Sequence, residues 1–180
     1  MVFVQRFLQL WGAAWALAAC ATLTPAEPPL SPEQLANAEY RSELLAGETV
    51  RLANGRYRQG PGGDASPVSE LRLGTPSATG DLNGDGVPDA AVILIADRGD
   101  GDFRCELAAV VNEGGKPRHG GSVFLGERVK VLSLAIRSGV ITVDYLCPGL
   151  GDPAFCARKR QTEAYRLEGD RLGRVWGPVP

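Results

Sequence analysis

Histidine, methionine and aromatic residues are scarce in this chain of 180 residues, which contains one His, one Met and 7% aromatic residues. With His119 as its one histidine, the chain has no multi-His zinc site and no obvious general base for a Ser or Cys nucleophile. Positive charge is not in excess either, because 19 Lys and Arg stand against 21 Asp and Glu, with no basic stripe interleaved with aromatic residues. We therefore expect no nucleic-acid partner, no catalytic site and no organic cofactor.

Long hydrophobic runs are also rare, and the one that stands out lies at the N-terminus. Residues 1–20 contain no acidic residue and a single base, Arg6, and the apolar stretch runs from Phe7 to Ala21. It is too short and too rich in alanine for a membrane-spanning helix, which needs about 20 strongly apolar residues. A short charged start, an apolar middle and a small-residue end are instead the layout of a secretory signal. No other run is long enough to span a bilayer, so we expect the exported domain to be soluble.

The end of this leader, Leu17-Ala18-Ala19-Cys20, resembles the lipobox of bacterial lipoproteins. The resemblance implies a signal peptide over residues 1–19, cleavage before Cys20, and lipid, including palmitate, on that cysteine. Since about two acyl chains hold a protein stably on a membrane, such an anchor would be firm. Residues 20–30 then form a Pro-rich tether, and residues 31–180 form one domain. We expect a monomer in the bacterial cell envelope, lipid-anchored to the membrane and facing the periplasm or the exterior.

Three cysteines remain once Cys20 carries lipid, and export places them in an oxidising compartment where disulfides persist. Cys147 and Cys156 flank a loop between two strand-like segments, and they are the favoured pair. Cys105 with Cys147 is the alternative, and the absence of any bridge is a third reading. An odd number of cysteines leaves one thiol free if a bridge forms.

Short strands dominate the rest of the pattern. Ser31 followed by Pro32 predicts a short helix over 32–38, and Asn54-Gly55 predicts a tight hairpin turn between strands at 48–52 and 56–59. The continuous apolar run 90–96 predicts a central strand that is buried on both faces. The other predicted strands cover 68–73, 103–112, 122–125, 128–137, 140–146 and 158–167. We therefore predict a single, mainly β domain. Its strands form an antiparallel meander sheet or a partly closed barrel, preceded by a short N-terminal helix.

The strongest chemical signal is the acidic loop 81–89, Asp-Leu-Asn-Gly-Asp-Gly-Val-Pro-Asp. Side-chain oxygens fall at positions 1, 3, 5 and 9, and Gly86 at position 6 permits a sharp turn that brings the Val87 carbonyl round as a further ligand. This is the spacing of the first nine positions of an EF-hand loop. Calcium takes six to eight hard oxygen ligands. The predicted calcium ligands are Asp81, Asn83, Asp85, Val87 and Asp89, with water completing the shell.

Position 12 of the pattern is Val92 rather than the bidentate Glu of an EF-hand, so the loop runs into a strand and not into a second helix. In this form the loop resembles FG-GAP and related β-repeat calcium sites, in which the ninth-position Asp binds the metal directly. The chain also resembles an uncharacterised group of secreted bacterial proteins, which carries no established activity. That likeness rests on residues 37–40, 50–52, 55–57, 80–91, 107–112, 124–131 and 151–153. It implies a single domain from about residue 31 to the C-terminus.

Other polar segments have plainer explanations. Residues 97–102 form an acidic turn that could hold a second cation, although a solvated turn accounts for it, and His119 is expected to be exposed in a Gly-rich loop. Asp144 and Asp152 could serve glycoside hydrolysis if they came together.

Three functions therefore remain open. The favoured reading is a calcium-stabilised, non-enzymatic envelope lipoprotein that binds a protein or polysaccharide. The alternative is an exported hydrolase that uses Asp and Glu residues with structural calcium. The third is a purely structural envelope protein without a small ligand.

Overall fold

The computed structural model describes residues 27–58, 70–97, 103–149 and 157–177. The chain is mainly antiparallel β structure with one short helix, as the sequence predicts, and its strands form separate sheets with no closed barrel in the described ranges. In chain order the elements are α1 (Pro32–Ala36), β1 (Glu39–Ser42), η1 (Glu43–Leu45), β2 (Glu48–Arg51), β3 (Arg56–Arg58), β4 (Glu70–Leu73), β5 (Ala78–Gly80), β6 (Asp89–Asp97), β7 (Phe103–Glu113), β8 (Lys116–Glu127), β9 (Lys130–Arg137), β10 (Val140–Pro148), β11 (Ala157–Glu168) and β12 (Arg171–Arg174).

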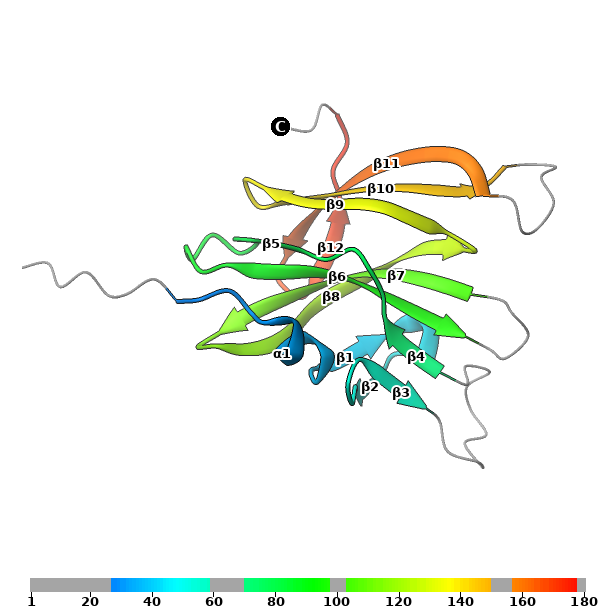
Figure 1. The fold of residues 1–180 in the computed structure, drawn as a ribbon. Coiled ribbons are helices and arrows are strands. Elements are labelled where there is room, and N and C mark those ends of the chain that lie inside the picture. The colour runs from blue at the N-terminus through cyan, green and yellow to red at the C-terminus, as the bar shows by residue number, and fades with distance from the viewer. Residues whose placement is uncertain (1–26, 59–69, 98–102, 150–156, 178–180) are drawn as a thin grey trace, which may run out of the picture.

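Three layers make up the molecule (Figure 1). The middle layer is a six-stranded sheet in the order β3-β4-β6-β7-β8, with β5 paired to β6 beyond the end of β4. The four-stranded sheet β12-β11-β10-β9 covers one face, and α1 with the two-stranded sheet β1-β2 covers the other.

The central strand β6 explains why the middle sheet carries two separate cores. Its alternate side chains point to opposite faces, as they must in a strand with a period of two residues. Val92 and Leu94 pack towards α1 and β1-β2 with Tyr40, whereas Ile93 packs towards the four-stranded sheet with Ile141. Nearly every residue of β6 is buried, which confirms the prediction of a strand enclosed on both sides.

The helix begins where the sequence predicts but is shorter. Ser31 forms a capping box with Gln34, because the Ser31 hydroxyl accepts the Gln34 N–H at 3.1 Å and the Gln34 side chain accepts the Ser31 N–H at 2.8 Å. The helix ends at Ala36 rather than at residue 38, since the Ala38 carbonyl accepts the Leu52 N–H at 3.0 Å and so extends the pairing of β1 with β2.

The turn at Asn54-Gly55 is confirmed, but the predicted hairpin around it is wrong. Both residues adopt the left-handed conformation, with φ of 51° and 78°, and a single bridge joins Ala53 to Arg56. Beyond that bridge β2 pairs with β1 and β3 pairs with β4. The backbone groups of the turn bond to other segments instead; for example, the Gly55 N–H donates to the Ala36 carbonyl at 2.7 Å.

Strand β8 is much longer than predicted. Residues 116–121 resemble a loop in composition, yet all of them except Gly120 pair with β7. Two register shifts accommodate the extra residues. His119 therefore lies on a strand and is half-buried, which corrects the expectation that it is exposed in a loop. Its ring makes an edge contact with Tyr40, with ring centroids 6.2 Å apart.

Two of the three cysteines considered for a disulfide, Cys105 and Cys147, lie in the described residues. Within residues 27–58, 70–97, 103–149 and 157–177 there is no disulfide, so Cys105 and Cys147 are not bonded to each other. The alternative bridge between those two is therefore wrong. Cys156, the favoured partner of Cys147, lies outside the described residues, so that pairing stays a prediction.

The predicted signal peptide, Cys20 and most of the tether also lie outside the described residues. In the part of the chain that the structure describes, no helix has the length and apolar character needed to cross a bilayer.

Candidate metal site

The acidic loop connects β5 to β6, and the fold closes it at both ends. Strands β5 and β6 are antiparallel neighbours, and Gly80 pairs directly with Asp89. The loop is therefore the connection of a hairpin within the middle sheet (Figure 1). Only glycine fits at position 80, since a Cβ there would lie 2.7 Å from Cγ2 of Ile136 on β9. This close approach packs β5 against the four-stranded sheet.

Three predicted ligands fold back over the loop through side chain to backbone bonds. The Asp81 carboxylate accepts the Gly84 N–H at 2.7 Å and the Gly86 N–H at 3.0 Å. Asn83 Oδ1 accepts the Asp85 N–H at 3.1 Å, and Asp85 Oδ1 accepts the Val87 N–H. Asn and Asp form such local turns readily, and each bond fixes a side-chain oxygen next to the backbone.

The conformation of the loop depends on its glycines. Gly84 and Gly86 both have φ of 83°, in the left-handed region that glycine adopts without strain. Gly86 is the position at which the sequence predicts a sharp turn. Asp81 is half-buried, while Asn83 and Asp85 are exposed, so the acceptors at positions 3 and 5 face solvent.

Asp89 differs from the other three predicted side-chain ligands because it is completely buried. One oxygen accepts the Leu82 N–H at 2.8 Å and the other accepts the Asn112 N–H on β7, also at 2.8 Å. The Asn112 side chain in turn donates to the Pro88 carbonyl at 3.2 Å. Asp89 thereby ties the start of the loop to the end of the neighbouring strand, a role that the motif alone does not indicate.

The loop also borders the four-stranded sheet. Leu82 is buried in the core between the two larger sheets, which draws the loop against the turn that joins β9 to β10. A cavity of about 450 Å³ lies between the loop and that turn, and Arg166 of β11 lines it. Asp81 lines the same cavity, so Arg166 brings positive charge to the side of the loop on which Asp81 lies.

The donor set fits calcium by its chemistry. Asp81, Asp85 and Asn83 place two carboxylates and one amide oxygen within five residues, and these are hard oxygen ligands of the kind that calcium prefers. No group of three or more His, Cys, Asp or Glu side chains within the described ranges lies close enough together to hold a metal ion. Each Asp89 oxygen retains one acceptor position beyond its backbone bond. Metal binding by all five predicted ligands stays a prediction.

The other acidic candidates do not form a second site among the described residues. Asp144 is buried and bonds to the Arg160 guanidinium, and the hydrogen bond from Arg160 holds the pKa of that carboxyl below its usual range. Asp144 is therefore an ionised structural group. Asp152, its suggested partner in glycoside hydrolysis, lies outside the described residues, as do residues 98–102 of the acidic turn. Burial raises the pKa of the Cys105 thiol to about 11, so it is not a thiolate nucleophile at neutral pH.

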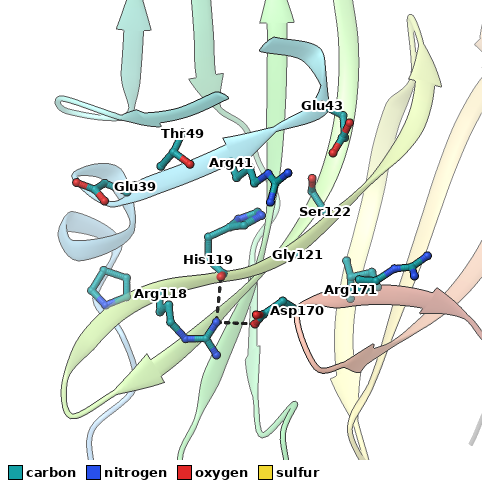
Figure 2. A pocket seen from close by; sticks show the side chains of 12 residues that line it. Glu39, Arg41, Glu43, Thr49, Arg118, His119, Gly121, Ser122, Asp170 and Arg171 are labelled. Atoms are coloured by element: carbon teal, nitrogen blue, oxygen red, sulfur yellow. Dashed lines mark hydrogen bonds and ion pairs between the residues drawn. The ribbon is translucent and has the colours of Figure 1, made fainter. Parts of the chain in front are cut away.

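Two polar features of the structure were not predicted. Glu106 on β7 is completely buried, accepts a hydrogen bond from the Ser42 hydroxyl at 2.7 Å, and has its pKa raised chiefly by burial. An acidic residue inside the otherwise apolar stretch of β7 was the sequence signal that could have indicated a buried carboxyl. The second feature is a polar pocket between β1, β8 and the turn before β12 (Figure 2).

Comparison with protein-family models, with curated proteins and with solved structures finds no match for this chain.

Proposed function

We propose that this protein is a bacterial envelope lipoprotein, anchored to the membrane through lipid on Cys20, whose β domain is stabilised by calcium at loop 81–89 and has a non-enzymatic binding or structural role. The observation that carries the proposal is the folding of Asp81, Asn83 and Asp85 over one short loop, with their oxygens fixed by backbone N–H groups. The lipobox-like sequence and the Pro-rich tether support the location.

Each group in the loop has a distinct task under this proposal. Bound calcium would supply positive charge between the carboxylates of Asp81 and Asp85, with Asn83 as a neutral ligand. Asp89 holds the loop to the core from behind, through the Leu82 and Asn112 N–H groups. Because β5 has only three residues, the loop contributes much of what keeps β5 paired to β6. Calcium would therefore stabilise the domain locally and through the central strand.

Thermal unfolding of the detergent-solubilised full chain, in calcium and in EDTA, tests the metal assignment. Free calcium at about 100 times its dissociation constant should add roughly 2.7 kcal/mol to the free energy of unfolding. Asp85→Ala should remove most of that gain. Glu48→Ala is the matched control, since Glu48 is an exposed acid on β2, away from the loop. Identical unfolding curves in calcium and EDTA would contradict the proposal.

The anchor has a separate test. Cells that express the full chain should incorporate labelled palmitate into it, and the protein should sediment with the membrane fraction. Cys20→Ser should abolish both, because without acyl chains nothing holds the domain to the bilayer under this proposal. Unchanged labelling of Cys20→Ser would refute lipidation at this cysteine without bearing on the calcium loop.

A further inference from the structure

A second polar region lies along β8, the edge strand of the middle sheet. A cavity of about 690 Å³ opens along this edge, and residues of both outer layers line it (Figure 2). Strand β1 lies on one side of it and the turn from β11 to β12 on the other. Residues of η1 and β2 line it as well, and its polar and charged side chains are Glu39, Arg41, Glu43, Thr49, Arg118, His119, Ser122, Asp170 and Arg171. None of them belongs to loop 81–89.

The close approach of β8 to the β11–β12 turn shapes the floor of this pocket. Gly121 has φ of 144°, and a Cβ on it would lie 2.9 Å from the backbone oxygen of Asp170. Glycine therefore allows the edge strand and the turn to touch. Arg118 reinforces that contact, because its guanidinium donates to Asp170 at 2.8 Å and to Glu113 at 2.5 Å. Arg118 and Asp170 thus neutralise each other and serve as part of the wall.

Two other arginines of the pocket are not neutralised in this way. Neither Arg41 nor Arg171 forms a side-chain hydrogen bond or an ion pair with any residue in the described ranges, and both are exposed. Figure 2 shows the Arg41 side chain extending from β1 over the His119 ring. Arg171 is on the opposite rim, at the start of β12. These two guanidiniums are the positive charge that the pocket offers to a ligand.

His119 contributes polarity without charge. Burial lowers the pKa of His119 to about 4, with smaller effects in the same direction from Arg41 and Arg118, so its imidazole is neutral at neutral pH. Its Nδ1 atom is buried and has no hydrogen-bond partner among the described residues. The ring contact with Tyr40 fixes its orientation. The pocket therefore combines free cationic donors with a neutral, oriented imidazole.

The remaining side chains suit hydroxyl groups. Ser122 on β8 and Thr49 on β2 each carry a hydroxyl that can donate and accept, and Glu43 carries a carboxylate that can accept from a ligand hydroxyl. Figure 2 shows the Ser122 and Glu43 side chains on the same side of the pocket as Arg41. Arginine is the residue best suited to carboxylate and phosphate, since its planar fork can make two parallel hydrogen bonds.

We propose that this pocket binds an acidic sugar. Arg41 on β1 holds the anionic group, a carboxylate or a phosphate, Arg171 on the opposite rim binds a second polar group of the ligand, and Ser122 and Glu43 hold the sugar hydroxyls. The proposal rests on the proposed function only for the source of the ligand, an acidic polysaccharide of the cell envelope. The pocket and loop 81–89 share no residue, so the failure of one proposal leaves the other intact.

Isothermal titration of the full chain with glucuronate, glucose 1-phosphate and glucose tests this. We expect one or both anions to bind at least about 10-fold more tightly than glucose. Binding of glucuronate alone would assign a carboxylate, and binding of glucose 1-phosphate alone would assign a phosphate. Equal affinity for glucose, or the absence of binding to all three, would overturn the proposal.

Substitutions then locate the site. Arg41→Gln should weaken anion binding by about 10-fold to 100-fold, the range expected for a lost hydrogen bond to a charged group. Arg137→Gln is the matched control, because Arg137 is exposed on β9 and lies outside the pocket. Arg171→Gln tests the opposite rim with no change near β1. The thermal midpoint should stay constant in all three variants. Equal affinities of Arg41→Gln, Arg171→Gln and the wild type would overturn the assignment.

Discussion

The buried carboxylate of Asp89 allows the loop to be tested without any metal present. Asp89→Ala leaves the Leu82 and Asn112 N–H groups, both bonded at 2.8 Å, without their acceptor. An unpaired buried polar group costs about 1–3 kcal/mol, so the free energy of unfolding should fall by about 2–6 kcal/mol. Asp89→Asn keeps one acceptor oxygen but turns an amide donor towards the second N–H. Its expected loss is therefore about half as large, about 1–3 kcal/mol.

Urea unfolding followed by circular dichroism, in EDTA at pH 7, measures these losses. Asp85→Ala is the control, since Asp85 is exposed and accepts a single backbone N–H. Its loss in EDTA should stay below about 1 kcal/mol, as for most surface substitutions. Small domains have about 5–15 kcal/mol of stability in total, so Asp89→Asn remains measurable even where Asp89→Ala does not fold.

The two variants also separate the two roles of an acid in this loop. If Asp89→Ala and Asp85→Ala lower the free energy of unfolding in EDTA by amounts within about 0.5 kcal/mol of each other, the structural role assigned to Asp89 is refuted. If Asp89→Asn is harmless in EDTA and harmful only in calcium, Asp89 acts as a metal ligand and not as a backbone acceptor. A large loss in EDTA with a retained response to calcium supports the arrangement described above.

Three further substitutions test the core and the packing around the pocket. Burial raises the pKa of Glu106, so the contribution of this carboxyl to stability is complete below its unfolded pKa and is lost as pH rises through its folded pKa. In a pH series, Glu106→Gln should therefore have the unfolding free energy of the wild type at about pH 4 and a higher one than the wild type at about pH 8. Gly121→Ala, which forces a Cβ against the Asp170 backbone at positive φ, should lose about 1–3 kcal/mol in urea unfolding, more than Gly169→Ala, where the space is open. Leu94→Ala empties a fully buried position and should lose about 2–5 kcal/mol, and a loss below about 1 kcal/mol would contradict the packing of that core.

The parts of the fold that the sequence predicts well are those in which hydrophobicity and length agree. The run that became β6 is apolar for seven successive residues, and only a strand between two layers can bury both of its sides. The turns at residues 54–55, 114–115 and 138–139 carry glycine, and each adopts positive φ. Local chemistry determines these features, so a local reading finds them.

The strands that the sequence does not reveal owe their existence to distant partners. Strand β5 has three residues and β1 has four, too few for a periodic pattern. The first half of β8 contains Pro117, Gly120 and Gly121, which are typical of loops, yet it pairs with β7 except at Gly120, where the register shifts. Strand propensity reflects how well a side chain fits its neighbours, and those neighbours are set by tertiary structure.

The loop shows the same division within nine residues. Spacing alone places Asp81, Asn83 and Asp85 on one turn, because their bonds reach no further than five residues along the chain. Asp89 follows the same spacing, yet one of its two bonds goes to Asn112, which is 23 residues away. A motif encodes the first kind of contact and is silent on the second. The ninth position is therefore where the EF-hand comparison is least informative about this chain.

The pocket at β8 follows from the layering, because a middle sheet covered on both faces still has edges. At the β8 edge both outer layers contact the edge strand, β1 from one layer and β12 from the other. Polar side chains collect there because the edge faces water while the faces of the sheet do not. His119, Arg41 and Arg171 come from three strands that are far apart in sequence, so no spacing rule could bring them together. Loop 81–89 is a product of local sequence, and this pocket is a product of the fold; evidence for a ligand at one does not count as evidence for a ligand at the other.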